Sequence, residues 1–429
     1  MYLNPVRTGF FIMKKEGKLK KFLKILGPGI ITGASDDDPS GIATYSQAGA
    51  SYGLGLLWMS LFTFPLMAAM QGMCARIGLV TSQGLTHTLR YRYPKIILYL
   101  MLVFSVPAII LNIGADIAGM GAVTNLLFPS VPAFAFSFVF TIIMMIVIIA
   151  YPYQKIAGIL KWFCLSILLY LVVPFIIKVN WKDVLVATFV PHIELNKDFI
   201  EMVVAILGTT ISPYLFFWQA TMEAEDQEHQ KKQVMVDKRI LRDMTADVNT
   251  GMFASNLVMM FIILTTGVVL HNAGIKDINT VDQAAKALEP LAGKFSYLFF
   301  ASGVIGTGFL AIPVLAGSLS YMLAECFGWQ EGLDKKFNEA RPFYIVIIFA
   351  LLIGLLINIL GISPMKALFY TAILYGVTSP VLIAVVMHIG NNKKIMNNFT
   401  NSRLSNILGM ITFIVMTLAS IALIYFQFQ

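Results

Sequence analysis

The sequence predicts an all-α integral membrane protein of about eleven transmembrane helices, and three observations support this prediction. Hydrophobic residues make up 58% of the 429-residue chain and charged residues only 13%, about half the charged share of a typical soluble protein. The apolar residues gather in stretches long enough to cross a bilayer, which takes about 20 residues per helix. The basic residues are concentrated in every second loop between these stretches, as in membrane proteins.

The hydrophobic stretches set the expected order of helices along the chain. The candidate spans are residues 25–50, 54–78, 96–127, 133–151, 156–178, 199–221, 246–271, 295–327, 343–360, 364–389 and 405–427. Residues 280–292 are expected to form a short surface helix before the eighth span. We expect no cleavable signal peptide, because no small-residue cleavage site follows a short apolar core near the basic N-terminus.

The distribution of basic residues predicts the orientation. If the N-terminus is cytoplasmic, 24 of the 31 Lys and Arg residues lie on the cytoplasmic side and seven on the other side. Cytoplasmic loops are enriched in these residues, so we expect a multi-pass protein of the cell membrane with its N-terminus in the cytoplasm. The same bias explains the net charge of +8 with the lipid bilayer, and no nucleic acid, as partner.

The first span contains three consecutive carboxylates, Asp36, Asp37 and Asp38, near its middle. One charged residue at the centre of a membrane helix costs about 2.5–3.5 kcal/mol on insertion scales, so these groups must face water, metal or other protein groups. Pro39 follows directly and lacks a backbone donor, and Gly41 permits an unwound backbone. We therefore predict that this helix breaks at the aspartates.

The sixth span contains a matching interruption, Gly-Thr-Thr-Ile-Ser-Pro, from Gly208 to Pro213. Pro39 and Pro213 each lie in the first of five successive spans, and such matched interruptions indicate an inverted-repeat transporter with its binding site at the unwound backbone. Prolines that merely kink structural helices are the alternative, but a kink does not require carboxylates. The predicted units are a basic cytoplasmic tail (1–24), two five-helix repeats (25–179 and 198–390), and a loop with an eleventh helix (391–429).

The residues at the two breaks favour a site for a hard cation. Carboxylates, hydroxyls and freed backbone carbonyls are oxygen ligands that suit Mg²⁺, Mn²⁺ or Ca²⁺. No His, Met or Cys lies at either break, so the softer ligands are missing. Asp38 is the first candidate metal ligand, and Asp36 and Asp37 are candidates for binding outer-shell waters or for concentrating cations.

Two more polar residues lie inside predicted spans. Asp116 in the third span is a functional candidate because intramembrane acids are usually functional; the alternative is a structural hydrogen bond to a neighbouring helix. Asn256 in the seventh span could reach the same cavity or form a helix–helix hydrogen bond.

Several short motifs occur between about residues 25 and 390. They are Gly27-Pro-Gly, Asp38-Pro39, Ala75-Arg-Ile-Gly-Leu-Val-Thr81, Arg92-Tyr-Pro94, Asp116-Ile-Ala, Asn125-Leu-Leu-Phe128, Gly208-Thr-Thr-Ile-Ser-Pro213, Ala301-Ser-Gly303 and Ala316-Gly317. Together they resemble the Nramp family of metal transporters. The resemblance implies the LeuT-type fold, in which two inverted five-helix repeats bind metal between unwound helices 1 and 6.

The sequence departs from the family pattern at the implied metal ligands. The family's Asp-Pro-Gly-Asn is Asp38-Pro-Ser-Gly41 here, so the aspartate is kept and the asparagine ligand becomes Gly41. The family's Met-Pro-His in helix 6 is Ser212-Pro-Tyr214, which replaces a thioether with a hydroxyl and a histidine with a tyrosine. The family's carbonyl ligand in helix 6 falls on Thr209.

Other departures concern proton carriers. The family's second helix 6 histidine falls near Gln219, the acid three residues after Asp116 is replaced by Gly119, and a glutamine of helix 10 falls on Thr378. Loss of the thioether removes the preference for transition metals, and loss of histidines and an acid removes groups that carry protons near neutral pH. The sequence resembles a divergent branch of the family that is associated with Mg²⁺ and Mn²⁺ uptake without evident proton coupling.

The sequence thus predicts a transporter, not an enzyme, that imports Mg²⁺ or Mn²⁺ by alternating access, needs no cofactor and is monomeric. The implied metal ligands are Asp38, Gly41, Thr209 and Ser212, and the residues expected at the metal entrance or its outer shell are Asp36, Asp37, Asp116, Asn256 and Thr378. Four other functions are considered. They are a proton-coupled transition-metal importer of the main family type, a sodium-coupled organic-solute symporter on the same fold, a membrane-embedded aspartyl hydrolase, and a channel.

Overall fold

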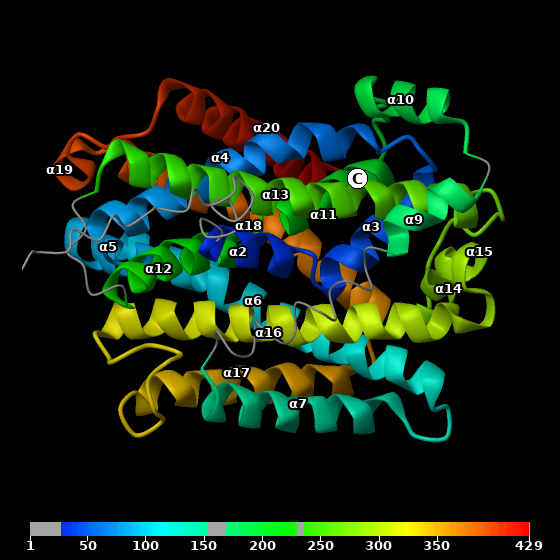
Figure 1. Ribbon diagram of the computed structural model, residues 1–429, viewed down its shortest axis with the longest axis horizontal. Coiled ribbons are helices and arrows are strands. Elements are labelled where there is room, and N and C mark those ends of the chain that lie inside the picture. The colour runs from blue at the N-terminus through cyan, green and yellow to red at the C-terminus, as the bar shows by residue number, and fades with distance from the viewer. Residues whose placement is uncertain (1–26, 153–168, 178, 230–235, 429) are drawn as a thin grey trace, which may run out of the picture.

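The computed structural model describes residues 27–152, 169–177, 179–229 and 236–428, and this part of the chain is entirely helical (Figure 1). Its α-helices are α2 (Pro28–Asp36), α3 (Pro39–Tyr52), α4 (Trp58–Thr81), α5 (Leu85–Arg92), α6 (Lys95–Leu127), α7 (Ala133–Ala150), α9 (Leu169–Ile176), α10 (Trp181–Phe189), α11 (Lys197–Thr210), α12 (Pro213–His229), α13 (Lys238–Thr266), α14 (Val281–Ala285), α15 (Glu289–Ala292), α16 (Ser296–Phe327), α17 (Arg341–Ile357), α18 (Pro364–Asn391), α19 (Lys393–Met396) and α20 (Arg403–Gln427).

Eight helical segments in the described residues are long and apolar enough to cross a membrane, and α17 is a shorter apolar helix. The predicted all-helical membrane fold is therefore confirmed. The first predicted span is divided into α2 and α3, and the segment 280–292 forms the short helices α14 and α15. The predicted tail, 1–24, and residues 156–168 of the fifth predicted span lie outside the described residues.

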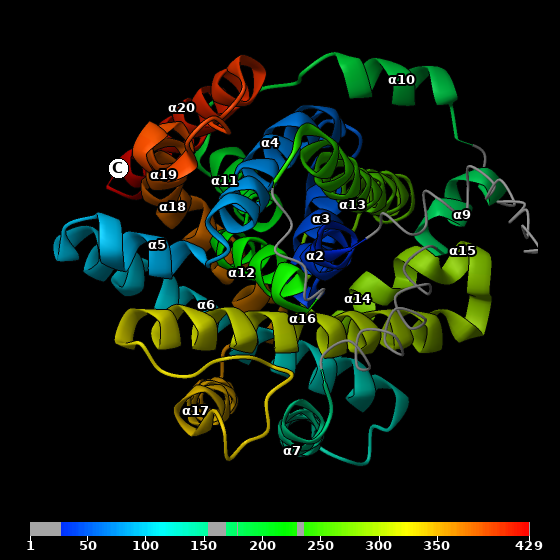
Figure 2. The ribbon, with the colours of Figure 1, turned by 60° about the vertical axis from the view of Figure 1, so that its left-hand side comes forward.

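The interrupted helices lie at the centre of the bundle. Figure 2 shows α2, α3, α11 and α12 with α4, α6, α13, α16 and α18 around them. In the α11–α12 segment 83% of the most apolar stretch is buried within the protein, compared with 22% in α7 and 28% in α20. The outer helices therefore face lipid, while the polar, broken helices are shielded by other helices.

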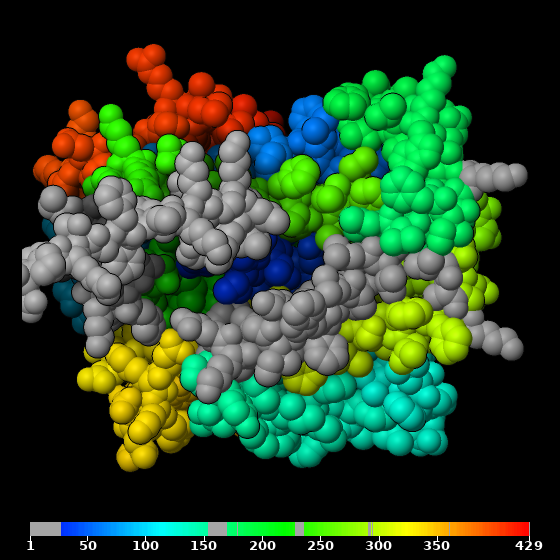
Figure 3. All heavy atoms as spheres, in the orientation of Figure 1, coloured from blue at the N-terminus to red at the C-terminus, as the bar shows by residue number. Residues whose placement is uncertain are grey.

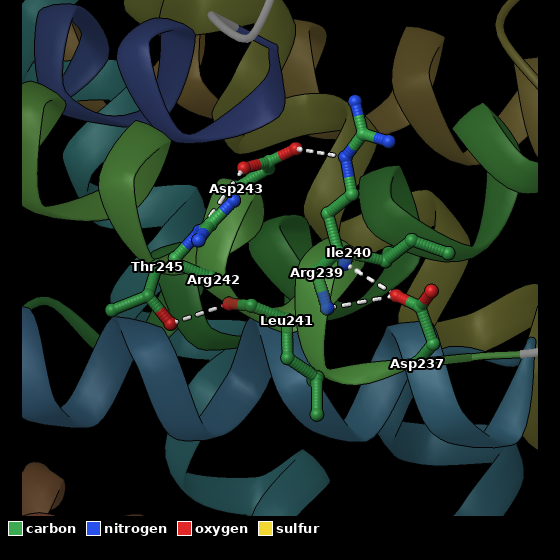
Figure 4. Close-up of polar contacts among 7 residues, drawn as sticks. All are labelled: Asp237, Arg239, Ile240, Leu241, Arg242, Asp243 and Thr245. Atoms are coloured by element: carbon green, nitrogen blue, oxygen red, sulfur yellow. Dashed lines mark hydrogen bonds and ion pairs between the residues drawn. The ribbon is translucent and has the colours of Figure 1, made fainter.

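Helix α13 is fixed at its start by polar contacts near the membrane surface (Figure 4). The Oδ1 atom of Asp237 accepts hydrogen bonds of 2.8 Å from the backbone N–H groups of Arg239 and Ile240, which satisfies two free donors of the first helical turn. Arg239 and Arg242 both pair with Asp243. From this start α13 runs across the membrane beside α2.

Glycines allow α2 and α13 to cross in close contact. A Cβ atom at Gly251 would lie 2.1 Å from the carbonyl oxygen of Gly29, and one at Gly33 would lie 2.3 Å from that of Gly251. Small residues at such crossings let helix backbones approach closely. Part of α2, in dark blue, is visible at the surface in Figure 3, but its α13 side is packed tightly.

We predict that Gly251→Ala lowers the free energy of unfolding by about 1–3 kcal/mol, because its methyl group forces two backbones apart. Thermal unfolding of the detergent-purified protein measures this effect as a lower Tm. Gly72→Ala in α4 is the matched control, since a Cβ atom there meets nothing within 4 Å and alanine favours helix. Equal Tm values for the two variants would contradict the proposed close contact.

Candidate metal site

The first helix break lies at Asp37 and Asp38, between α2 and α3. Asp38 has extended backbone angles (φ −70°, ψ 173°), as expected for a residue that precedes proline. Its Oδ1 atom accepts a hydrogen bond of 2.7 Å from the backbone N–H of Gly41, so Asp38 caps the start of α3. The local sequence thus places a carboxylate at the point where the helix restarts.

The second oxygen of Asp38 faces α6 and α18. Its Oδ2 atom accepts a hydrogen bond of 3.0 Å from Asn112 Nδ2, and Asn112 Oδ1 accepts one of 3.3 Å from the Thr371 hydroxyl. The neighbouring Ser40 hydroxyl donates to the carbonyl oxygen of Leu368 at 2.8 Å. Neutral donors therefore hold the Asp38 carboxylate, and among the described residues no basic side chain forms an ion pair with it.

The second break lies at Ile211 and Ser212, between α11 and α12. The Ser212 hydroxyl donates to the carbonyl oxygen of Thr209 at 2.6 Å, and the Ser379 hydroxyl of α18 donates to that of Ile211 at 3.3 Å. These hydroxyls satisfy carbonyls that the interruption frees from the helix.

The two breaks lie against each other near the middle of the bundle. The Tyr214 hydroxyl donates to the carbonyl oxygen of Ser35 at 3.1 Å, which joins the start of α12 to the end of α2. A Cβ atom at Gly41 would lie 3.5 Å from Thr209 Oγ1. The structure therefore brings Asp38, Gly41 and Thr209 close together, and Ser212 follows within one helical turn.

Asp36 and Asp37 face a different helix from Asp38. The Ser255 hydroxyl of α13 lies 2.8 Å from Asp36 Oδ2 and 3.3 Å from Asp37 Oδ1. Asp36 is 1% exposed and Asp37 is 5% exposed. Both carboxylates are thus inside the protein beside the break.

Asp116 lies on the same side of the site as Asp38. It is one turn beyond Asn112 in α6, and residues four apart share a helix face. It is fully buried, its charge interacts with that of Asp38, and neither of its carboxylate oxygens has a hydrogen-bond partner. Of the two possibilities for this acid, the absence of a partner does not support a structural hydrogen bond.

Asn256 and Thr378 make their hydrogen bonds away from the aspartates. The Asn256 side chain accepts a hydrogen bond of 2.8 Å from the Thr63 hydroxyl and donates to Met67 Sδ at 3.1 Å, so it links α13 to α4 as in the helix–helix alternative. The Thr378 hydroxyl donates to the carbonyl oxygen of Leu374 in its own helix at 2.9 Å.

Sequence analysis missed the neighbours of these two residues. Ser255, directly before Asn256, meets the aspartates, and Ser379, directly after Thr378, meets the second break. A signal for Ser379 was present, because it precedes Pro380 within a hydrophobic stretch just as Ser212 precedes Pro213. Ser255 has no such neighbour, and only its distance to α2 identifies it.

Several buried oxygen atoms around the breaks have no hydrogen-bond partner within the protein. They are Asp36 Oδ1, both carboxylate oxygens of Asp116, and the hydroxyls of Tyr45 and Tyr375. Buried polar groups are normally hydrogen-bonded, and exceptions often mark a place for water or an ion. No group of three or more His, Cys, Asp and Glu side chains in the described residues has the arrangement of a metal cage. The donor set therefore suits a hard ion that keeps part of its water.

Near its N-terminal end α2 is fastened to its neighbours. The Asp247 carboxylate of α13 accepts hydrogen bonds from the backbone N–H groups of Gly27, Gly29 and Ile30 at 2.8, 2.6 and 3.2 Å. The Thr32 hydroxyl donates to Gln219 of α12 at 2.5 Å. These bonds hold α2 against α12 and α13 on this side of the aspartates.

A cavity of about 470 Å³ lies on the opposite side of the breaks. Its lining comes from α3, α11, α18 and the segment that follows α13, and it includes Asp198, Glu201 and Asp277. It reaches Ala43, two residues beyond Gly41. The site is thus approached by a polar cavity from one side, while the bonds to α2 lie on the other.

Comparisons with known proteins agree with this architecture. The family model described as "Natural resistance-associated macrophage protein-like" (Nramp) matches residues 29–426. A relative from Caldanaerobacter subterraneus, named divalent metal cation transporter MntH, is 26% identical over 92% of this chain and 91% of its own length. A protein of the same name from Chromohalobacter salexigens is 25% identical over 88% of this chain and 85% of its own.

Solved structures share the fold. The manganese transporter of Eremococcus coleocola has a TM-score of 0.76 at 16% identity and covers 96% of this chain and 88% of its own. The transporter MhsT has a TM-score of 0.61 at 10% identity over 96% of this chain and 98% of its own. These likenesses confirm the expected LeuT-type fold. With a family model that spans nearly the whole chain, they lead to one conclusion: the protein belongs to the Nramp family of membrane metal transporters and is not an enzyme.

Proposed function

We propose that this protein imports hard divalent cations, Mg²⁺ or Mn²⁺, across the cell membrane by alternating access and without tight coupling to protons. The observation that carries this proposal is the donor set at the two breaks, where Asp38, Thr209 and Ser212 offer carboxylate, carbonyl and hydroxyl oxygens. A site without thioether or imidazole favours hard cations over softer transition metals. The names of the relatives, divalent metal cation transporters, and of the manganese transporter with the same fold support the substrate class.

Each proposed ligand has a distinct role. Asp38 supplies the negative charge, Thr209 supplies its carbonyl oxygen, and Ser212 binds directly or through a water molecule. Gly41 leaves space beside Asp38 where a larger side chain would stand. Because Mg²⁺ dehydrates reluctantly and usually keeps several waters, a site with one directly bound carboxylate fits a largely hydrated ion, with Asp116 among the groups around its water shell.

The two sides of the site support an alternating-access mechanism. The cavity that reaches Ala43 admits ions from one side, and the bonds from Asp247 and Gln219 to α2 close the other. If the N-terminus is cytoplasmic, as the basic residues indicate, the cavity faces outward and ion release requires the α2 bonds to break. In this proposal residues 25–179 and 198–390 form the two inverted repeats, and one monomer is sufficient for transport.

The rival functions fit the site less well. A proton-coupled transition-metal importer would be expected to have soft ligands and titratable histidines at the breaks, whereas all five histidines lie elsewhere. A symporter for organic solutes shares the fold, but fold alone does not assign substrate. The aspartates at the first break would repel a substrate carboxylate, which such sites bind with uncharged backbone groups.

We predict that Asp38→Ala lowers Mn²⁺ and Mg²⁺ uptake into proteoliposomes at least about tenfold, because losing the anionic ligand costs about 1.4 kcal/mol or more. The control is Asp183→Ala, which removes an exposed aspartate of α10 and should leave uptake unchanged. Equal uptake by wild type and Asp38→Ala would refute the site assignment.

The ligand chemistry predicts the ion selectivity. Cd²⁺ should compete weakly with Mn²⁺ in the wild type, and Ser212→Met should strengthen that competition because a thioether prefers soft ions. Ser212→Thr, which keeps the hydroxyl, is the matched control. Competition by Cd²⁺ in the wild type as strong as that by Mn²⁺ itself would instead favour a transition-metal importer.

We predict that Mn²⁺ uptake proceeds without proton uptake, since no histidine lies at either break to carry a proton near neutral pH. A pH-sensitive dye inside the liposomes and a metal-sensitive dye in a parallel sample measure both fluxes. Acidification of the interior that follows the metal concentration would show that protons are co-transported and would contradict this part of the proposal.

A further inference from the structure

Two carboxylates meet a single hydroxyl beside the proposed transport site. The Ser255 hydroxyl lies within hydrogen-bond distance of Asp36 Oδ2 and Asp37 Oδ1. A serine hydroxyl carries one proton, so it can donate to only one of these oxygens at a time. Two negatively charged groups therefore converge on one donor, and this arrangement is unfavourable unless a cation lies between them.

Further oxygen atoms near this pair are buried and unpaired. The Oδ1 atom of Asp36 has no partner although the residue is 1% exposed. The Tyr45 hydroxyl, which belongs to α3, is also fully buried without a partner, and it interacts electrostatically with Asp36 and Asp37. Carboxylate and hydroxyl oxygens from three helices, α2, α3 and α13, thus surround one place.

The charge balance of the site calls for more than one divalent ion. Four carboxylates are buried around the breaks, Asp36, Asp37, Asp38 and Asp116, and no ion pair among the described residues involves any of them. Uncompensated buried charge is very costly, and the end of α2 adds the negative pole of a helix dipole next to Asp36. One divalent ion balances two of these charges, and two ions balance all four.

The two groups of ligands are separate. The Asp38 oxygens are oriented by Gly41 and Asn112 toward α6, whereas Asp36 and Asp37 are oriented by Ser255 toward α13. We propose that Asp36, Asp37, Ser255 and Tyr45 form a second binding position for a hard divalent cation, next to the one at Asp38. This inference rests on the proposed function. A second ion so close repels the first and promotes its release, as neighbouring ions do in multi-site conduction pathways.

The test is the number of Mn²⁺ ions bound by the full-length purified protein, measured by equilibrium dialysis. We expect two per chain in the wild type, one in the Asp36→Asn/Asp37→Asn double variant and one in Asp38→Ala. The control Asp183→Asn, which removes an exposed acid outside the site, should bind two. A double variant that still binds two ions would overturn the inference.

A second measurement on the wild type does not depend on the folding of a variant. Anomalous scattering from Mn²⁺-soaked crystals should show two peaks, one beside Asp38 and one between Asp36 and Ser255. A single peak beside Asp38, or a second position that takes up Na⁺ and excludes Mn²⁺, would overturn the inference. Wild-type protein that binds one ion and still transports would refute this inference alone, whereas protein that transports no divalent ion would refute the proposed function.

Discussion

The structure depends on one constraint, namely that carboxylates can be kept inside a membrane only where helices stop being regular. Asp38 illustrates the solution, because the extended backbone before Pro39 turns its side chain into the cap of α3. A regular helix would direct this carboxylate sideways into its neighbours with no free N–H to receive it. The break therefore supplies a donor for the acid and at the same time frees backbone groups that can bind an ion.

The remaining helices shield this arrangement from lipid. Amide and hydroxyl groups of α6, α13 and α18 reach the aspartates and the second break, while the apolar faces of α7 and α20 are left to the bilayer. Glycines at the α2–α13 crossing bring the two backbones together, and this places Ser255 opposite Asp36 and Asp37. Packing density and binding chemistry are thus linked at the same contact.

The electrostatics of the site and its access routes support one picture of transport. Negative charge without basic partners attracts cations, and hard oxygen donors select among them. A polar cavity leads toward the breaks from one side, whereas Asp247 fastens the start of α2 on the other. Because α2 also carries Asp36 at its other end, movement of this helix would change both the seal and the ligands together.

The sequence by itself determined the membrane class, the family and the positions of the two helix breaks, because hydrophobic length, proline and consecutive aspartates act locally along the chain. It also pointed to Asp38 and Thr209, which the structure brings close together. The sequence could not show that Ser255 and Ser379 meet the breaks, or that the hydrogen bonds of Asn256 and Thr378 lie elsewhere. Adjacent residues in a helix point about 100° apart, so a small rotation or shift of α13 or α18 exchanges which side chain faces the site. Only tertiary packing sets that rotation.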